Sequence, residues 1–336
     1  MRKGTQYSLL TIVAMVFLLS AIMQAQQKLA QTGLQFLEIG LSPRAEAMGG
    51  AFVLAGDKAD ALFYNPAGIA KGSPSYDIVL NRVQWFADMN YNAIGATYQP
   101  SSGEYGVIGL SFLTADYGDF YGTRVAAGTP EGYEDIGMFT PTAYAVGLSY
   151  AKEITDKFTI GGQAKYVSQA LGSNMLTAGG SQKENSVSGY SFDFGMMYST
   201  AIKGFDFGMS IKNFAADFKY EQYSFEAPLT FRVGVSLRPF ELLGMPDPDN
   251  DLLIVADAVH PRDFGEHLDL GAEYTLSKMV SFRVGYKVNY SEQDLTAGLG
   301  FNYSVLSDVN VRMDYAYGRF GLWNNVQRLA LGFTMF

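Results

Sequence analysis

Cysteine is absent from this sequence of 336 residues, histidine and tryptophan occur only twice each, and charged residues make up only 17% of the chain. The lack of cysteine excludes a disulfide framework and a thiol nucleophile. Soluble globular proteins usually carry about 25% charged residues, so this chain has fewer charges than that class. The net charge of −9 leaves no basic excess for a nucleic-acid-binding surface, and we expect no nucleic-acid partner.

Long apolar runs are also missing from the chain after its N-terminal stretch. No run there reaches the roughly 18 residues typical of a transmembrane helix. The mean hydropathy of +0.03 is correspondingly far below that of a protein with several such helices. Glycine (37), phenylalanine (24) and tyrosine (22) are abundant instead. This apolar and aromatic content excludes a disordered chain and indicates a β protein of one or two domains.

The first 25 residues have the features of a secretory signal peptide. Arg2 and Lys3 precede an apolar stretch, Leu9–Leu19, and the small residue Ala25 is followed by polar Gln26. The alternative is an N-terminal anchor helix, which is disfavoured because the apolar stretch is too short to span a bilayer. We therefore expect an exported protein that is cleaved after Ala25.

Apolar and polar residues alternate in many segments of the remaining chain. In Ser188–Thr200, Leu229–Arg238 and Val280–Tyr290, every second residue is apolar and the residues between are mostly small or polar, which is the period of a β-strand. A soluble sandwich and a small closed barrel also produce this pattern. Alternation alone therefore leaves both soluble and membrane architectures open.

Segment length and composition favour a transmembrane barrel. The segments are about ten residues long, which suits a tilted crossing of a bilayer, whereas soluble strands usually have about five or six. Aromatic residues lie near the ends of their apolar faces, as in the interfacial girdles of outer-membrane barrels. In lipid, a closed barrel satisfies every backbone group without spanning helices. We predict an all-β membrane protein, a 14-stranded antiparallel transmembrane β-barrel with a small N-terminal helical or turn plug, in the lipid of a bacterial outer membrane.

The pattern predicts fourteen strands. They are Tyr76–Phe86, Asn90–Gln99, Gly103–Ala115, Thr140–Ala151, Phe158–Ala170, Ser188–Thr200, Phe205–Asn213, Leu229–Arg238, Leu252–Val259, His267–Leu276, Val280–Tyr290, Leu295–Ser304, Val309–Tyr317 and Val326–Phe336. Short and longer links alternate between them, apart from the long link Pro239–Asp251 on the side of the short turns. Because short turns are periplasmic in outer-membrane barrels, the longer links are expected outside, as loops of modest size. The terminal aromatic Phe336 is similar to the C-terminal insertion signal of such barrels.

Residues 26–75 differ from the rest, and we assign residues 1–25 to the signal peptide, 26–75 to the plug and 76–336 to the barrel. Short helices and turns are expected in the plug because Gly49-Gly50 and the stretch from Pro66 to Gly68 interrupt it. Asp57 is expected to cap the turn that follows it.

Stretches of this segment resemble the N-terminal signature of the PorV/PorQ family, a branch of the FadL-like outer-membrane barrels. The resembling stretches are Arg44–Phe52, with Arg44, Gly49 and Gly50, Asp57–Ala61, and Tyr64–Gly68, with Asn65, Pro66 and Gly68. Later stretches are similar too, at Tyr144–Ala151, Thr155–Phe158, Gly208–Asn213 and Ala227–Val235. The resemblance implies fourteen strands and the type IX secretion system. PorV-like proteins bind cargo C-terminal domains and a large translocon barrel, PorQ-like proteins act in surface attachment of cargo, and many paralogues have no assigned role.

Residues with catalytic or metal-binding chemistry are few. His260 and His267 lie near several aspartates, but polar loop and lumen residues explain them better than a metal cluster. Asp247–Asp251 is similar to the start of a calcium loop, yet it lacks the glycine and the glutamate that such a loop needs. No motif places a serine beside a histidine, so a phospholipase-like enzyme is disfavoured. We expect no catalytic residue, no metal and no cofactor.

Ten charged residues fall on the polar side of their strands and are expected to face the lumen. They are Lys165, Asp193, Asp206, Lys212, Arg232, Glu273, Arg283, Lys287, Arg312 and Asp314. A basic residue facing lipid at mid-bilayer would cost about 2–4 kcal/mol, so these side chains are expected to point inward. Two interpretations stay open: a paired network that stiffens the barrel around the plug, and a polar conduit.

Two functions remain after an enzyme is set aside. The first is a non-enzymatic barrel of the type IX secretion system that binds cargo C-terminal domains, the large translocon barrel, or both. The alternative is a FadL-like transporter that carries hydrophobic small molecules across the outer membrane.

Overall fold

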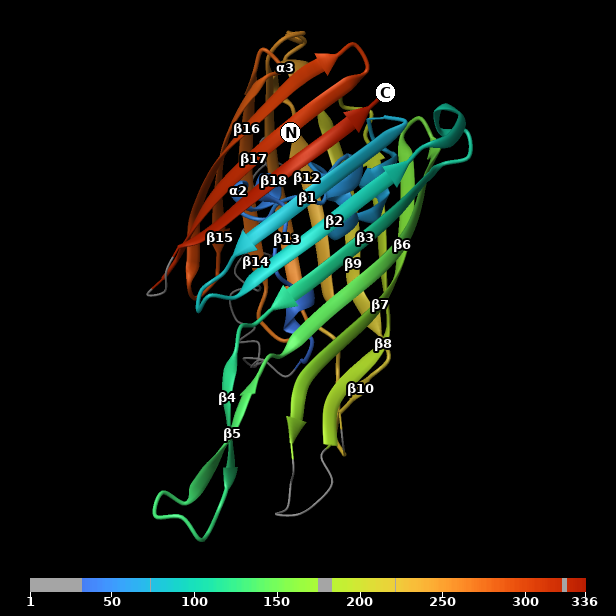
Figure 1. Ribbon diagram of the computed structural model, residues 1–336. Helices are drawn as coiled ribbons and strands as arrows, with labels where there is room; N and C mark the ends of the chain where they lie inside the picture. Colours follow the sequence, from blue (N-terminus) through green and yellow to red (C-terminus); the bar gives the residue numbers. More distant parts are fainter. Residues whose placement is uncertain (1–31, 73, 175–182, 221, 322–324) are drawn as a thin grey trace, which may run out of the picture.

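The structure, a computed structural model, describes residues 32–72, 74–174, 183–220, 222–321 and 325–336 (Figure 1). The predicted signal peptide, residues 1–25, lies outside the described residues. No helix in the described part of the chain is long and apolar enough to cross a membrane.

Fourteen strands pair with their neighbours in antiparallel order and close into a barrel, which confirms the predicted fold class. Around the barrel the order is β1-β18-β17-β16-β15-β14-β13-β12-β9-β8-β7-β6-β3-β2. The strands are β1 (Tyr76–Gln84), β2 (Asn90–Tyr98), β3 (Val107–Asp116), β6 (Thr142–Thr155), β7 (Phe158–Asn174), β8 (Lys183–Ser199), β9 (Phe205–Ala215), β12 (Thr230–Leu237), β13 (Asp251–Pro261), β14 (His267–Leu276), β15 (Val280–Val288), β16 (Gln293–Leu306), β17 (Val309–Phe320) and β18 (Val326–Met335).

Each predicted segment coincides with one of these strands, although several ends were placed wrongly. The segment predicted to start at Gly103 starts as β3 at Val107, because the short helix η4 (Pro100–Gly103) and positive φ angles at Gly103 and Gly106 delay it. At the opposite extreme, β7 and β8 each extend to 17 residues, past the stretch where apolar residues alternate.

Alternation along each strand separates a lipid-facing wall from a lumen. In β1 the exposed side chains of Ile78 and Leu80 alternate with buried Val79 and Asn81, and β6 and β18 show the same period. Exposed apolar residues on the outside of a closed barrel are the requirement of a bilayer, which reverses the usual placement of apolar residues in a water-soluble protein.

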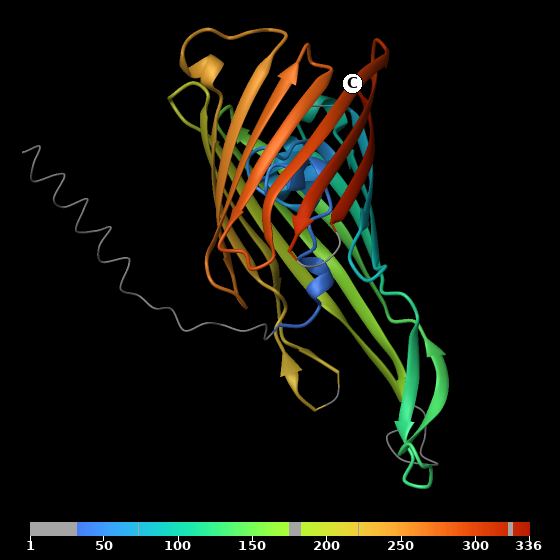
Figure 2. The ribbon, with the colours of Figure 1, turned by 90° about the vertical axis from the view of Figure 1, so that its left-hand side faces the viewer.

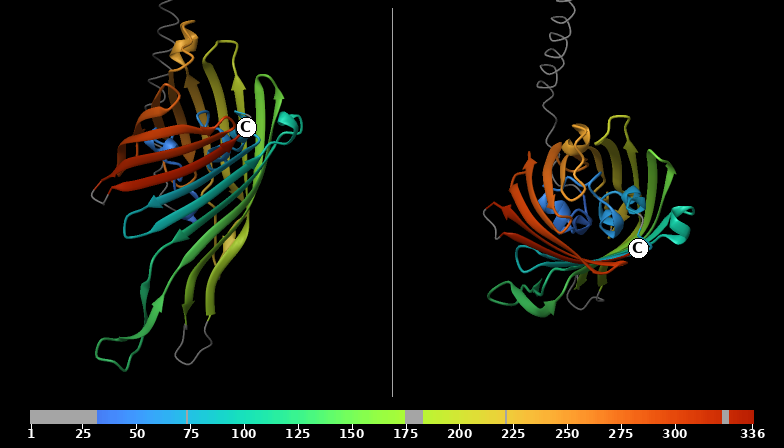
Figure 3. Two further views of the ribbon diagram at one scale, coloured as in Figure 1. Left: turned by 45° about the horizontal axis from the view of Figure 1, so that its top comes forward. Right: turned by 90° about the horizontal axis from the view of Figure 1, so that it is seen from above.

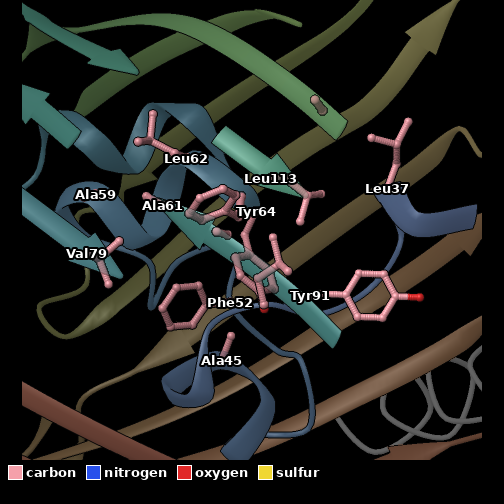
Figure 4. Packing of buried hydrophobic residues seen from close by; sticks show 14 of the residues in the cluster. Leu37, Ala45, Phe52, Ala59, Ala61, Leu62, Tyr64, Val79, Tyr91 and Leu113 are labelled. Atoms are coloured by element: carbon pink, nitrogen blue, oxygen red, sulfur yellow. The ribbon is translucent and has the colours of Figure 1, made fainter. Parts of the chain in front are cut away.

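The N-terminal segment, residues 33–72, lies inside the ring of strands (Figures 2 and 3) and is called the plug segment below. It contains η1 (Gln35–Leu37), α2 (Pro43–Ala47), η2 (Lys58–Phe63) and η3 (Pro66–Ala70). Its apolar side chains form the core: Phe52 and Tyr64 pack edge to face with ring centroids 5.0 Å apart, and Leu62 lies beside wall residue Val79 (Figure 4). The division of the whole chain into signal peptide, plug and barrel stays a prediction.

Wall glycines let the plug segment approach the strands closely. A Cβ atom on Gly195 of β8 would lie 1.8 Å from Oδ1 of Asn65, and one on Gly285 of β15 would lie 2.0 Å from the backbone N of Gly49. Both contacts are too close for any side chain, so glycine at these wall positions is required by the plug rather than by the strands.

The two ends of the barrel differ. The C-terminus and the turns β6–β7, β14–β15 and β16–β17 lie at one end, called the short-turn end, where α3 (Pro239–Leu242) occupies the one long link (Figure 1). At the other end, called the long-link end, a hairpin of β4 (Phe120–Val125) and β5 (Tyr133–Phe139) projects beyond the barrel strands. The link 117–141 is therefore larger than the modest loop that the sequence suggested. A smaller hairpin, β10 (Phe218–Lys219) with β11 (Ser224–Phe225), forms in the β9–β12 link at the same end.

The plug segment crosses the lumen between these ends. Near its start the backbone N–H of Gly33 donates to the carbonyl of Glu226 (3.1 Å), and Thr32 Oγ1 donates to Asp263 Oδ2 (2.6 Å), both at the long-link end. Its last residues lead into β1, which begins at the short-turn end beside Met335. The segment therefore passes from one mouth of the barrel toward the other.

Candidate functional site in the barrel lumen

Asn65 organises the part of the plug segment that touches β7 and β8. It is the N-cap of η3, because its Oδ1 accepts from the backbone N–H of Ala67 (3.1 Å), and Pro66 follows at the first helical position, where proline is favoured. Its amide Nδ2 donates to the carbonyl of Val53 (2.8 Å), which ties two turns of the plug together. The close approach of Ala67 to Gly161 places this turn directly on the wall.

Arg44, on α2, connects the plug segment to the wall. Its Nε and Nη2 donate to the two carboxylate oxygens of Glu273 on β14 (2.9 and 2.8 Å), while Nη1 donates to Asp57 Oδ1 (2.6 Å). The bidentate geometry is the strong form of this pair. The expectation that Asp57 caps η2 was wrong, since its side chain makes no capping hydrogen bond and is instead bound by Arg44. Burial would raise the pKa of Asp57, but Arg44 outweighs burial and holds it below its ordinary value.

The chain of charges continues along the wall from Glu273. Arg283 of β15 donates to Glu273 Oε2 (2.5 Å) and to Asp314 Oδ1 of β17 (2.6 Å), and all three side chains are almost fully buried. Register explains the arrangement, because Glu273 lies directly opposite Arg283 in the β14–β15 pair. Arg44, Glu273, Arg283 and Asp314 thus form a chain of alternating charge from the plug segment to β14, β15 and β17.

A second connection runs through Glu46, also on α2. Its Oε2 lies 3.0 Å from Lys287 Nζ of β15 and 3.4 Å from Arg328 Nη2 of β18. Burial would raise the pKa of Glu46, yet the two cations outweigh burial and lower it to about 2. Arg328 also donates through Nε to the carbonyl of Gly40 (2.8 Å), so one wall arginine binds the plug at two places.

A third connection has an uneven balance of charge. Arg312 of β17 donates to both oxygens of Asp77 on β1 (3.0 and 3.0 Å) and lies 3.9 Å from Asp60 of the plug. Asp77 also accepts from Thr334 Oγ1 (2.5 Å). Arg312 therefore interacts mainly with Asp77 and only weakly with Asp60. Burial raises the pKa of Asp60 to about 6, because the distant Arg312 compensates it only in part.

Backbone groups of the plug are bound by the wall as well. Asp257 Oδ2 on β13 accepts from the backbone N–H groups of Phe52 and Val53 (2.7 and 3.0 Å). Arg232 on β12 donates to the carbonyl of Gly50 (3.1 Å) and to Asp269 Oδ2 (3.0 Å). The positive φ angles of Gly49 (72°) and Gly50 (89°) form the turn that presents these groups.

A bulge in the wall contacts the first part of the plug. Opposite Asp193 of β8, the strand β9 has an extra residue, and Asn213 there adopts a φ of 61°. Asn213 accepts from Lys165 Nζ (2.6 Å) through Oδ1 and donates through Nδ2 to Glu38 Oε1 (2.9 Å), while Lys165 also lies 2.7 Å from Asp193. Burial raises the pKa of Glu38, although nearby Lys212 and Arg232 oppose it.

The structure thus brings together most, but not all, of the charged residues singled out in the sequence. Two of the ten lie apart from the paired clusters. Lys212 is 5.6 Å from the ring centre of Tyr64 and has no ion pair within the described residues, and Asp206 forms a long ion pair with Arg238, at 3.9 Å. Gly68 packs against the backbone carbonyl of Gly56, inside the plug itself.

The two histidines do not form a metal site in the described part of the chain. His260 Nδ1 lies 3.3 Å from Glu266 Oε1, and His267 stacks on Tyr290 with ring centroids 4.0 Å apart. Within the described ranges, no group of three or more histidine, aspartate or glutamate side chains could hold a metal ion. The Asp247 carboxylate accepts hydrogen bonds from Asp249 and Asn250, as in an ordinary polar turn.

Two cavities lie between the plug segment and the wall. One, of about 160 Å³, is lined by charged groups that include Arg44, Lys58 and Lys278 and lies near the short-turn end. The other, of about 30 Å³, is lined by apolar plug residues such as Leu37 and Leu62 together with Lys212. The second is about the space of one water molecule.

Sequence reasoning assigned the aspartates near the histidines to loop or lumen positions, but it did not include the partners of the ten charged residues in the network. Asp77, Asp257, Asp269 and Arg328 lie on the lumen side of their strands, so the alternation used for the ten residues could have found them. Glu38 follows η1, Glu46 is in α2 and Asp60 is in η2, and these helices are too short to show a periodic signal, so only the folded structure places the three residues against the wall.

Comparison with known proteins gives a family. Residues 132–327 match the family described as "Type IX secretion system membrane protein PorP/SprF". This match runs from the start of β5 into β18 and includes none of the plug segment. The secretion system is the one implied by the resemblance in the sequence. The matching family is PorP/SprF, and the finer resemblance to PorV/PorQ is not confirmed. A search of curated proteins found no match.

Solved structures give the same fold. The chain is similar to the CymD monoaromatic hydrocarbon channel (TM-score 0.58, 14% identity, 90% of this chain and 98% of that one). It is also similar to the Pseudomonas putida toluene transporter TodX (0.58, 11% identity, 92% and 100%) and to a Pseudomonas aeruginosa FadL homologue (0.53, 10% identity, 88% and 98%). At these identities the likeness shows a FadL-like barrel fold, and with the family it locates the protein in the outer membrane.

Proposed function

The chain belongs to the PorP/SprF family of type IX secretion system membrane proteins, and from that premise we propose that it acts as a non-enzymatic, protein-binding barrel of that system. Its partners are then the C-terminal domains of secreted cargo, the large translocon barrel, or both, as in a PorV-like role. Of the two interpretations of the lumen charges, the paired network that holds a plug is the one we adopt.

The observation that carries this proposal is the way the lumen is filled. Arg44 and Glu46 of the plug bind wall residues on β14, β15 and β18, and Asp257 binds the plug backbone from β13. These attachments lie along one arc of the wall, from β13 to β18, and Asn65 adds a contact with another arc, since its Nδ2 lies 3.4 Å from the carbonyl of Met196 on β8. Because the plug fills the lumen, we propose that the barrel acts through its outer surface and its end loops and not as an open channel.

The division of the chain is part of the proposal. Residues 1–25 serve as the signal peptide, residues 26–75 as the plug and residues 76–336 as the barrel. The resemblance of the stretch around Asn65-Pro66 supports a plug of the PorV or PorQ type. The family match covers residues 132–327 and includes none of the plug segment. No catalytic role is assigned to any residue.

A transporter of hydrophobic small molecules is the competing function. Two of the similar structures are those of a monoaromatic hydrocarbon channel and a toluene transporter. Ligand sites of that kind usually have volumes of about 300–1,000 Å³. The apolar cavity of about 30 Å³ beside Leu37 and Leu62 is too small for such a ligand. A cavity of about 570 Å³ lies at the β1–β2 turn, but charged and amide side chains such as Arg82, Asp88 and Gln327 line it, which suits an apolar ligand poorly and speaks against transport in this conformation.

Affinity purification of the full-length protein from its native outer membranes tests the proposal. We expect mass spectrometry to identify a very large barrel or secreted proteins that share a C-terminal domain, both absent when an unrelated barrel is purified in the same way. Recovery of the protein alone, with bound fatty acid or another apolar molecule, would overturn the proposal and favour transport.

A further inference from the structure

The β4–β5 hairpin has two faces of different character. Pairing places Phe120 opposite Phe139 and Arg124 opposite Glu134 on one face, where the two rings stack with centroids 5.9 Å apart and Arg124 forms an ion pair with Glu134. A bulge in β5 puts Ile136 over Gly122 on this side as well. The side chains of this face contact one another, although Phe120 and Ile136 are still about half exposed.

The opposite face presents apolar side chains to solvent. Two cross-strand pairs, Tyr121 with Met138 and Val125 with Tyr133, lie on it because residues two apart in a strand share a face. Tyr121 is 76% exposed and Val125 is 89% exposed. We call these four residues the apolar hairpin face.

A single charge lies in the middle of the apolar hairpin face. Asp135 is opposite Thr123, between the two apolar pairs, and its carboxylate has no hydrogen bond or ion pair with another described side chain. The rest of the link is acidic too, since Asp119, Glu131 and Glu134 accompany it and Arg124 is its one basic residue. A surface that covers this face must therefore be apolar and carry a positive charge near its centre.

Lipid does not fit this description. The hairpin projects past the strand ends at the long-link end, away from the wall that lipid covers (Figures 1 and 2). Short turns face the periplasm in outer-membrane barrels, so the hairpin extends into the outside medium. A two-stranded hairpin is only marginally stable by itself in water, and both outer edges of this one are unpaired in the described sheet.

We propose that the apolar hairpin face is a docking surface for a secreted protein domain of β-structure, which covers the four apolar residues and places a lysine or arginine against Asp135. The proposal rests on the proposed function, because that function brings secreted proteins to the outer face of this barrel. Unpaired strand edges suit a β-structured partner, since such a partner can extend the two-stranded sheet.

Site-specific photo-crosslinking in cells tests this surface in the full-length chain. A photoreactive residue replaces Val125, and in a matched control it replaces Tyr223. Tyr223 is 86% exposed at the same end of the barrel but lies outside the β4–β5 hairpin. We expect adducts with a secreted protein at position 125 and few at position 223. A second pair of variants adds Tyr121→Ser or Asp135→Lys to the Val125 probe, and each should lower the adduct yield about tenfold, as loss of a contact that dominates an interface does.

Each other outcome overturns the inference. Adducts with lipid, or with a second copy of this chain, would assign the face to another occupant. Equal yields at positions 125 and 223 would show no specific surface. If the wild-type protein still co-purifies with secretion components while position 125 gives no adduct, the docking surface fails and the proposed function stands. If the wild type recovers no secretion component, both fail. Unchanged heat-dependent migration of the folded barrel in gels verifies that each variant has inserted.

Discussion

The lumen and the β4–β5 hairpin differ in which side chains they bury and which they expose. In the lumen, charged groups such as Arg44, Glu273 and Arg283 are buried and paired at hydrogen-bonding distance. In the hairpin, large apolar groups such as Tyr121 and Val125 are left in water. A folded protein avoids unpaired buried charge and contiguous exposed apolar surface. The lumen follows the first rule except at Lys212, which has no ion pair within the described residues, and at Asp60, whose charge is compensated only in part. The hairpin breaks the second rule, and this contrast supports our proposal that the protein acts through surfaces outside the lumen.

The comparison predicts large effects for changes within the lumen. We expect Arg283→Met to lower the free energy of unfolding by about 3–5 kcal/mol, because Glu273 and Asp314 would lose their shared partner while staying buried. Denaturant unfolding in detergent micelles measures this effect. Arg319→Met is the control, because the ion pair of Arg319 with Asp294 is exposed, and we expect a change of about 0.5 kcal/mol or less. Similar losses in both variants would contradict the account of the network.

A steric change at the plug contact should have the next largest effect. Gly195→Val places side-chain atoms where Asn65 now lies, and we expect a loss of about 3 kcal/mol, with faster proteolysis within the plug segment. Gly265→Ala serves as the control, because a Cβ there meets nothing within 4 Å. Equal protease resistance of Gly195→Val and the wild type would show that the plug is not held against β8.

The plug carboxylates should respond to pH with opposite signs. The folded pKa of Glu46, about 2, is below its ordinary value of 4.5, so its contribution is present above about pH 4.5 and is lost as the pH falls toward 2. The folded pKa of Asp60, about 6, is above its ordinary value of 3.8, so its ionisation costs stability as the pH rises from about 4 to 6.

Asp60→Asn separates the two contributions. We expect this variant to be more stable than the wild type by about 3 kcal/mol at pH 7 and no more stable at pH 3.5, because the neutral amide has no charge to bury. Thermal unfolding between pH 3.5 and 7 measures the difference. A constant difference across this range would contradict the assigned burial of Asp60.

Changes on the apolar hairpin face should have the smallest effect on stability. Tyr121→Ser combined with Tyr133→Ser should change the free energy of unfolding of the barrel by about 0.5 kcal/mol or less, since neither side chain packs on the plug or the wall. The denaturation assay used for Arg283→Met measures it directly. A loss near that of Arg283→Met would show that the hairpin is part of the folded core.

The sequence predicted the wall well because each wall strand has one face in lipid and one in the lumen. That division produces the alternation of Ser188–Thr200, and β8 contains this segment except for its last residue. The strand ends that project into water have no lipid-facing side and therefore no alternation of this kind, so β7 and β8 were predicted too short. The hairpin was missed for the same reason, since both of its faces are largely in water and Gly122 and Gly137 interrupt its pattern.

The connections of the plug could not be read from the sequence. Arg44 and Glu273 are 229 positions apart, and only closure of the barrel brings them to 2.9 Å. Alternation predicts that Glu273 and Arg283 face inward, and strand pairing then explains their contact. It gives no information on Glu46, because a five-residue helix has too few turns to show a periodic pattern.

Ion conductance of the purified protein in planar lipid bilayers tests the central claim that the plug closes the barrel. For the wild type we predict conductance at the background of the bare bilayer, and for a variant that lacks residues 33–72 we predict stable open-channel currents. Comparable open currents from the wild type and the deletion variant would contradict the claim, because a lumen filled by the plug leaves no continuous aqueous path.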